Sequence, residues 1–522
     1  MTDQTSPLRV QFSGMAYGGD AVGRDPDGRA VFAWPGIEGE TADVAITEAR
    51  NTFSRGLVVA IEEPSPSRVM PPCPYFGSCG GCQWQHIDYQ AQLRFKSEIL
   101  ASQLSRIGGI ADPGAVLRPP IGSPVEFGYR NSSHFAVDPL SGKVAYFRRD
   151  THSLIPVDEC PISNAGINAA IPLVNSVIAS TRVPVEQEDA RGLLRLWKVT
   201  IRFSEAAGQT VVIFHSRLPR TAKGAMPRKK GRGTTQAAPI ERPDGGPSAE
   251  PSPEASPAIV LQRREVRRAL AALADRLAAT QPLVIIEVME DGTTNALGET
   301  RAASSGGVEA HADAVSGSLL GPGRREQEPA ERLPLGAWVE QLGGRHYWIP
   351  PLAFFQVNTA AAELMLAEVR EHMPATVGLL LDAHAGVGTF AAAFARTAAR
   401  VIAFEVDSSA VLGARWTARA HQFSNVEFRV GKAEALVTRL RSDEQPDVVV
   451  LDPPRSGCHP ALLAELARRK VPRIIYVSCD PSTLARDVKL LSNTYELASA
   501  RALDMFPQTY HIETVARLDL KV

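Results

Sequence analysis

The feature that most constrains the fold is a regular alternation of apolar strands and helices from about residue 350 to residue 522. The strand-like runs are VGLLLDAHAGVG, RVIAFEVD, PDVVVLDPP and RIIYVSCDP, and helix-like runs such as SAVLGARWTARAHQ and PALLAELARR lie between them. Alternation of this kind builds a mostly parallel sheet with helices on both faces. The sequence therefore predicts an α/β, doubly wound domain at this end of the chain.

The first of these strands runs into a turn that contains Gly386 and Gly388, and Glu405 ends the next strand. Glycines at such a turn let a ligand approach the backbone, and an acid about 20 residues later commonly binds ribose hydroxyls. With Ala391 the string also fits G-x-G-x-x-A. The turn by itself indicates an adenosine-containing ligand, leaves a dinucleotide cofactor open, and could be purely structural.

Two later strand ends narrow the chemistry. Asp452 follows one strand in VVVLDPPRSG, and Cys479 follows the next in IIYVSCDPSTLARD. A thiolate that adds to C6 of uracil makes C5 nucleophilic toward S-adenosylmethionine (SAM), and a base must then remove the C5 proton. We expect Cys479 to be the nucleophile and Glu513, in FPQTYHIETVARL, to be the base. Alternatively, Cys479 is a small buried residue and Glu513 is a surface acid, or His511 is the base.

A second group of thiols lies in PPCPYFGSCGGCQWQH, where Cys73, Cys79 and Cys82 account for three of the six cysteines in the chain. No secretory signal or membrane-spanning run is evident, so we expect a cytoplasmic protein whose clustered thiols bind metal. Thiolates suit iron–sulfur clusters or zinc, and the C-x5-C-x2-C spacing alone leaves both open. The pair Gly80–Gly81 would let backbone N–H groups turn toward cluster sulfurs.

The rest of the chain divides into a barrel, a mixed region and loose stretches. Short alternating segments over 8–62 predict a small β-barrel, and 115–215 mixes strands with one helix. Residues 217–257, rich in basic residues and then in Pro, Glu, Ser and Ala, predict a disordered insertion, and 300–332 is a second loose stretch. The formal net charge of -1 is mild evidence against a nucleic-acid partner, although a local basic face can coexist with it.

Together these motifs resemble the SAM-dependent RNA uracil-5-methyltransferases, which make 5-methyluridine in tRNA and 23S rRNA. GGDAVGR and VFAWPGIEGE look like the family's TRAM domain, and SPSRVMPPCPYFGSCGGCQWQHIDYQAQLRFK looks like its cluster segment. YRNSSHFAV, IPVDECPI and PLAFFQVN are similar to its middle part, and DPPRSG, SCDPSTLARD and HIETVARL to its catalytic core. The resemblance covers nearly the whole chain apart from the two loose stretches.

The resemblance implies an N-terminal OB-like TRAM β-barrel that binds RNA, an α+β central domain, and a C-terminal class I (Rossmann-like) SAM methyltransferase domain. The expected bounds are 1–65 for the barrel, 66–216 and 258–345 for the central domain with its cluster segment at 73–160 and its insertion at 217–257, and 346–522 for the catalytic domain.

The resemblance also implies the ligands of two cofactors. A [4Fe-4S] cluster is expected on Cys73, Cys79, Cys82 and Cys160, the last of these in DECPI, and the remaining cysteine, Cys458, is taken as incidental. The SAM contacts carry over to Gln356, His384, Glu405 and Asp452. Because the cluster is far from the nucleophile in sequence, we expect it to serve folding or RNA positioning.

The chain departs from the family's usual pattern at the SAM site and near the nucleophile. His384 and Ala385 stand where the family often has an aromatic residue and then cysteine, and Thr389 stands where asparagine is common. SCDP replaces the commoner SCNP, and TYH replaces THH. Phe354 or Phe355 is expected either to stack on the extruded uracil or to pack in the core.

The implied function is methylation of C5 of a specific uridine in RNA, and we expect the protein to be a monomer with no membrane partner. 23S rRNA is the preferred substrate, because the cluster-bearing bacterial members resemble this chain most, and tRNA is the alternative. The alternative from another class is a non-catalytic RNA-binding or iron-sensing protein, which the departures at His384 and Ala385 keep open.

Overall fold

The computed structural model describes six stretches of the chain, which contain the barrel, most of the central region and the C-terminal domain. These stretches are residues 6–181, 193–217, 259–262, 283–289, 294–300 and 337–521. The insertion expected at 217–257 lies outside the described residues except for residue 217, and the loose stretch at 300–332 lies outside them except for residue 300. No helix within these stretches is long and apolar enough to cross a membrane.

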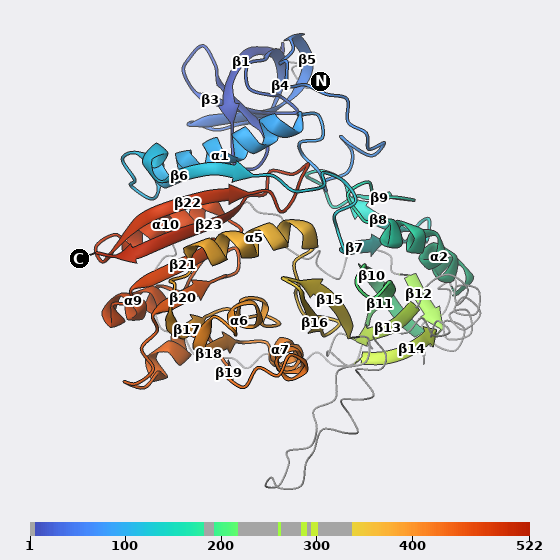
Figure 1. Cartoon of the computed structure of the whole chain (residues 1–522). Helices are drawn as coiled ribbons and strands as arrows, with labels where there is room; N and C mark the ends of the chain where they lie inside the picture. Colours follow the sequence, from blue (N-terminus) through green and yellow to red (C-terminus); the bar gives the residue numbers. More distant parts are fainter. Residues whose placement is uncertain are drawn as a thin grey trace, which may run out of the picture.

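The N-terminal strands form a closed barrel in the order β1-β2-β3-β5-β4, as the alternating segments predict (Figure 1). The strands are β1 (Leu8–Met15), β2 (Ala21–Arg24), β3 (Ala30–Trp34), β4 (Thr41–Ala49) and β5 (Phe53–Glu63). Inward residues such as Val10 and Phe12 alternate with exposed ones on β1. Closure removes the free strand edges that a small sheet would otherwise expose.

The C-terminal sheet has eight strands in the order β19-β18-β17-β20-β21-β23-β22-β6. The strands are β6 (Leu117–Ile121), β17 (Val377–Asp382), β18 (Ala398–Glu405), β19 (Val426–Val430), β20 (Val448–Leu451), β21 (Arg473–Ser478), β22 (Tyr495–Leu503) and β23 (Glu513–Leu520). The strands from β19 to β21 are parallel, and β23 is antiparallel to both of its neighbours. The predicted α/β fold class is confirmed.

The strand order reverses between β17 and β20, because the chain builds outward from β17 to β19 and then returns to add β20 on the other side. Ligands of doubly wound sheets bind at the carboxyl ends of the strands beside such a reversal. The helices of this domain are α5 (Thr359–His372), α6 (Thr389–Phe394), α7 (Ser408–Ala420), α8 (Ala433–Leu436), η2 (Val437–Arg439), α9 (Pro460–Arg469) and α10 (Pro481–Leu491). This reversal positions the site.

The central sheet lies beside the C-terminal domain and has the order β14-β13-β11-β10-β7-β8-β9, with β12 paired to β10 (Figure 1). Its strands are β7 (Ser132–Val137), β8 (Val144–Phe147), β9 (Leu154–Pro156), β10 (Leu193–Ser204), β11 (Gln209–Arg217), β12 (Ile259–Gln262), β13 (Leu283–Met289) and β14 (Thr294–Thr300). Helix α2 (Ala165–Thr181) packs on this sheet through Ile171, and a hairpin of β15 (Trp338–Leu342) and β16 (Arg345–Ile349) leads into the C-terminal domain.

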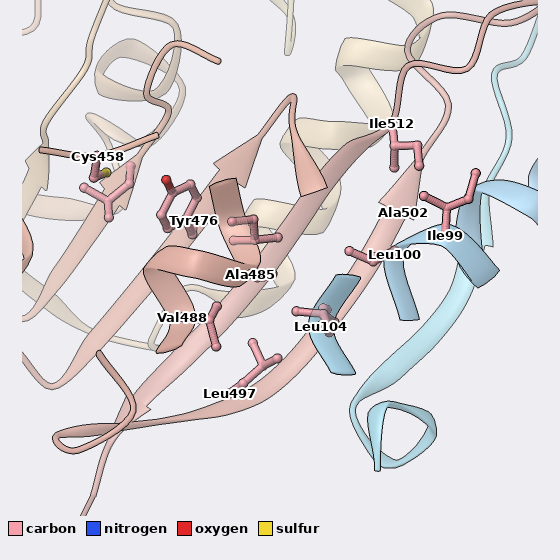
Figure 2. Close-up of a cluster of buried hydrophobic side chains, with 14 of the residues drawn as sticks. Ile99, Leu100, Leu104, Cys458, Tyr476, Ala485, Val488, Leu497, Ala502 and Ile512 are labelled. Atoms are coloured by element: carbon pink, nitrogen blue, oxygen red, sulfur yellow. The ribbon is translucent and has the colours of Figure 1, made fainter. Parts of the chain in front are cut away.

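Helix α1 (Tyr89–Arg106) joins the barrel to the C-terminal domain. It begins at Asp88, whose side chain caps the first turn, and a short turn η1 (Pro113–Ala115) follows it. Leu100 and Leu104 of α1 lie against Leu497 and Ala502 of β22, as Figure 2 shows. The same hydrophobic cluster extends into the barrel, so the two domains share one continuous core.

Candidate active site

The nucleophile predicted from the sequence lies in a tight turn between β21 and α10. Cys479 directly follows the last residue of β21 and is half-buried. Asp480 caps α10, because one of its carboxylate oxygens accepts hydrogen bonds from the backbone N–H groups of Ser482 and Thr483 at 2.8 and 3.1 Å. Ser478 Oγ donates to the backbone oxygen of Asp480 at 3.0 Å. These bonds fix the residues on both sides of the thiol.

The predicted base lies on the neighbouring strand. Ser478 and Thr514 are direct partners in the antiparallel pairing of β21 with β23, so Cys479 and Glu513 come next to each other at the end of that pair. Glu513 is only 4% exposed. Burial raises its pKa well above the usual range, the charge of Asp452 raises it further, and Arg455 opposes the shift. A buried carboxyl with a raised pKa is a stronger base once it is ionised.

Asp452 completes a cluster of acids around the thiol. It follows β20, the parallel neighbour of β21, and burial raises its pKa to about 7. The pKa of Cys479 is raised to about 12 by burial and then by the charges of Glu513 and Asp452, whereas Arg455 lowers it. The thiol is therefore protonated at neutral pH, and the exposed Arg455 is the positive group that favours the thiolate.

The glycine turn after β17 is built as a ligand-binding turn. Gly386 and Gly388 have φ values of 55 and 83°, in the left-handed region that favours glycine. A Cβ atom at Gly386 would meet nothing within 4 Å, so a ligand can approach the backbone there. The carboxylate of Glu405 accepts hydrogen bonds from the backbone N–H groups of Gly386 and Asp407, each at 2.8 Å. Glu405 thus lies at the turn, where the sequence places a ribose-binding acid.

His384, which lies two residues before Gly386, and Gln356 have different surroundings. Burial lowers the pKa of His384 to about 4, so the ring is neutral, and its Nδ1 has no hydrogen-bond partner within the described residues. Gln356 is 7% exposed, and its backbone oxygen accepts a hydrogen bond from Asn131 Nδ2 at 3.0 Å. The segment YRNSS therefore fixes the segment that carries Gln356.

The two adjacent phenylalanines have different surroundings. Phe355 is 4% exposed and packs against Tyr347, with ring centroids 5.8 Å apart. Phe354 is 65% exposed. Of the pair, Phe354 is the one free to stack on a base.

The four cysteines that are predicted to bind a cluster also come together in the structure. Cys73, Cys79, Cys82 and Cys160 line one small pocket. Cys160 reaches it because its backbone N–H donates to Asn168 Oδ1 at 2.9 Å at the start of α2. Gly81 N–H lies 3.4 Å from Cys79 Sγ, which is the backbone contact that the glycine pair predicts. Burial raises the pKa values of Cys79 and Cys82 to about 11 and 12.

The charge around this pocket suits an anionic group. Arg130 lines it, and its Nε is buried with no hydrogen-bond partner in the part of the chain that the structure describes. Glu159 lies at the exposed rim. Among the described residues no three His, Cys, Asp or Glu side chains are grouped to hold a metal ion. The iron–sulfur cluster stays a prediction, for which four cysteine thiols are the usual ligands.

Comparison with known proteins identifies the family. A family model described as tRNA (Uracil-5-)-methyltransferase matches residues 343–521. An uncharacterized RNA methyltransferase of Gloeobacter violaceus is 30% identical over 525 residues, which cover 99% of this chain and 97% of that protein. The chain belongs to the RNA uracil-5-methyltransferase family. The predictions of family membership and of an enzyme are confirmed, and membership of a methyltransferase family supports SAM as the methyl donor.

Two further relatives agree. An uncharacterized RNA methyltransferase of Synechocystis is 29% identical over 98% of this chain and 95% of its own length. The crystal structure of Pyrococcus abyssi tRNA (uracil-54, C5)-methyltransferase in complex with S-adenosyl-L-homocysteine aligns with a TM-score of 0.61 at 23% identity, over 98% of this chain and 100% of that chain. The match to that structure shows that this methyltransferase shares its fold.

The cysteine segment of this methyltransferase lies against the loop that precedes Glu513, although the two are far apart in sequence. The backbone N–H groups of Gln83 and Trp84 donate to the backbone oxygen of Gln508 at 3.1 and 3.0 Å. Gln92 Nε2 donates to Gln508 Oε1 at 3.0 Å, and Gln508 N–H donates back to Gln92 Oε1 at 3.0 Å. The distance in sequence from Cys479 therefore understates how closely this segment bears on the active site.

Sequence reasoning missed three residues that the structure places at this site: Arg455, Gln508 and Tyr17. Arg455 and Gln508 lie in DPPRSG and FPQTYH, strings already singled out for their neighbours. Gln508 has a φ of 70°, a left-handed conformation that a non-glycine sequence does not reveal. Tyr17 precedes GGDAVGR, and no local pattern links it to the nucleophile.

Proposed function

We propose that this RNA methyltransferase methylates C5 of a uridine through a covalent bond between Cys479 and C6 of the base. The observation that carries the proposal is the adjacency of Cys479 and Glu513, fixed by the pairing of Ser478 with Thr514. A uracil carbon needs both a thiolate and a nearby base, and no simpler methyl transfer uses this pair. Asp452 at the next strand end lies beside both groups.

The proposed steps balance as follows. The half-buried Cys479 thiol first gives its proton to solvent. The thiolate then forms a bond to C6, and the electrons of the C5–C6 double bond move toward O4 to form an enolate. Bound SAM supplies the methyl group that C5 takes up. Glu513 then removes the C5 proton, the double bond re-forms, and the thiolate leaves. Arg455 stabilises the thiolate at both ends of this cycle, because it is the positive group that lowers the pKa of Cys479.

SAM would lie at the carboxyl ends of β17 and β20. The glycine turn and Glu405 would hold its ribose, His384 would contact the cofactor with a neutral ring, and Gln356 and Asp452 would complete the site. The open space beside Gly386 and the unpaired Nδ1 of His384 support this assignment. The uncommon histidine thus offers a polar atom where the family often has an aromatic residue.

The four pocket thiols, Cys73, Cys79, Cys82 and Cys160, would hold a [4Fe-4S] cluster. The cluster is supported by the single pocket that the four thiols line and by the Nε of Arg130, which has no hydrogen-bond partner among the described residues. Zinc is the competing occupant. The cluster would support the loop around Gln508 through Gln83 and Trp84, and so act on folding and site geometry rather than on redox chemistry. Iron and sulfide analysis of anaerobically purified protein distinguishes the two metals.

The substrate we propose first is 23S rRNA, on the resemblance to cluster-bearing bacterial members. tRNA is the second candidate, favoured by the family description and by the substrate named for the Pyrococcus abyssi protein. We further propose that the barrel at 1–65 is a TRAM-type RNA-binding domain, that 66–345 without the insertion is the central domain, and that the enzyme acts as a cytoplasmic monomer.

The decisive experiment uses 23S rRNA and tRNA transcripts that carry tritium at uracil C5. Purified protein and SAM are added, and tritium released to water is counted. Release from one transcript is expected, because Glu513 must remove the C5 hydrogen, and the transcript that gives it identifies the substrate. No release from either transcript by folded, iron-loaded protein would refute the proposed function.

A further inference from the structure

A loop of the barrel reaches the turn that carries the nucleophile. Tyr17 lies between β1 and β2, and its hydroxyl donates a hydrogen bond to Asp480 Oδ2 at 3.0 Å, across 463 positions of sequence. Asp480 directly follows Cys479. The barrel therefore has a direct polar contact with the residue next to the reacting thiol.

This barrel loop is itself held from several sides. Gly19 accepts a hydrogen bond from the buried Trp84 Nε1 at 3.0 Å, and Asp20 accepts one from Arg149 Nη2 at 3.0 Å. A Cβ atom on Gly19, which has a φ of 100°, would lie 3.1 Å from Gln83 Cβ. The loop is docked closely on the cysteine segment and on the turn after β8, so its position relative to the active site is defined.

The two carboxylate oxygens of Asp480 have different hydrogen-bond partners. Oδ1 caps α10 through Ser482 and Thr483, and Oδ2 accepts from Tyr17. Asparagine, the commoner residue in the resembling family, has one carbonyl oxygen and an amide that only donates. An asparagine here could cap the helix or accept from the tyrosine, but it could not do both in this way. The aspartate therefore fits a tyrosine donor.

Tyr17 also contacts the loop that carries the base. Its ring packs edge-on against Tyr510, with centroids 5.6 Å apart and an interplanar angle of 86°. Tyr510 lies against His511, two residues before Glu513. Burial and the charge of Asp480 raise the pKa of Tyr17, so the hydroxyl stays protonated and remains a donor. One side chain thus touches both catalytic segments.

We propose that Tyr17 is a positioning residue, which aligns the Cys479 turn and the Tyr510 loop from the barrel so that nucleophile and base face the same uracil. The proposal rests on the proposed function above. It makes the barrel a structural part of the active site as well as a surface for RNA. An RNA that shifts the barrel loop would then alter the reactivity of the thiol directly.

The test is Tyr17→Phe, which removes one oxygen atom and keeps the ring. Single-turnover formation of the covalent adduct is measured with saturating SAM and an RNA transcript containing 5-fluorouridine, whose C5 fluorine blocks the final elimination. The transcript is the one that releases tritium from the wild type. Adduct formation should slow about tenfold, whereas the affinities for SAM and for the RNA should stay within about twofold. Tyr495→Phe, which loses a buried hydroxyl contact to Leu466, is the matched control with an unchanged rate.

Asp480 supplies the second arm. If Tyr17 acts through Asp480, Tyr17→Phe should have little further effect in an Asp480→Ala background, because the acceptor is already gone. Adduct formation should slow less in Asp480→Asn than in Asp480→Ala, because the asparagine amide can donate a hydrogen bond to the Tyr17 oxygen. An unchanged rate in Tyr17→Phe, a loss confined to RNA affinity, or full multiplication of the two effects would overturn the proposal. Failure of the wild type to form an adduct would instead refute the proposed function.

Discussion

The protein contains a single half-buried thiol and a pocket of four thiols, and the titratable neighbours of the two differ. Cys479 lies beside Glu513 and Asp452, whereas the pocket thiols lie beside Arg130. Burial raises the thiol pKa values in both places. The neighbours then suit the two proposed roles: the acids favour the protonated form of the single thiol, and the buried cation would suit thiolates bound to the proposed cluster. Spacing in sequence finds such thiols, but their neighbours assign the chemistry.

The largest expected effect comes from Cys479→Ala, which removes one thiol group from this comparison and leaves the other intact. Turnover should fall by at least about a thousandfold, because no other group can bond to C6. SAM affinity by calorimetry and iron content should be unchanged. Tritium release at a rate near that of the wild type would break the assignment of the nucleophile.

The next effect is the pH dependence of the thiol itself. The pKa of Cys479 in the folded protein is about 12. At every pH below this value, the fraction of Cys479 that is thiolate increases as the pH is raised. Alkylation of Cys479 by iodoacetamide in the free enzyme should accelerate about a hundredfold from pH 7 to pH 9. Mass spectrometry of the peptide that contains Cys479 follows this thiol alone. A rate that levels off below pH 9 would show an activated thiolate and contradict the effect of the acids.

Loss of a pocket thiol should act through the loop at Gln508. Cys82→Ser is expected to lose most of its iron and to slow tritium release about tenfold or more, because Gln83 and Trp84 then hold Gln508 less firmly. Cys458→Ala is the matched control: Cys458 is 2% exposed in the core near Tyr476, and its variant should retain iron (Figure 2). Full turnover by iron-free Cys82→Ser would show that the two regions are independent.

The smallest effect tests the charges directly. Arg455→Gln should slow adduct formation about tenfold with unchanged iron content, because the cation that lowers the pKa of Cys479 is removed. Arg130→Gln should change the other readout: it should lower the iron content and leave the rate of alkylation of Cys479 unchanged. If both variants affected both readouts equally, the electrostatic distinction between the sites would not hold.

The local patterns in the sequence predicted most of the elements. The alternating segments over 8–62 became the strands β1 to β5, the helix expected within 115–215 is α2, and the helix-like runs SAVLGARWTARAHQ and PALLAELARR became α7 and α9. These predictions succeed because the alternation of apolar residues and the helix caps act between near neighbours in the chain. The motifs also singled out Cys479 and Glu513, which the structure places side by side, and the four pocket cysteines, but not the charged residues around them.

The sequence by itself determined the fold class, the residue types of the site and the family to which the chain belongs. Only the tertiary structure decided that the barrel reaches Asp480 through Tyr17, that the cysteine segment holds Gln508, and that β6 pairs with β22 as the edge strand of the C-terminal sheet. The physical reason is that these contacts join residues hundreds of positions apart. Their partners are chosen by how whole elements pack, so no local pattern records them.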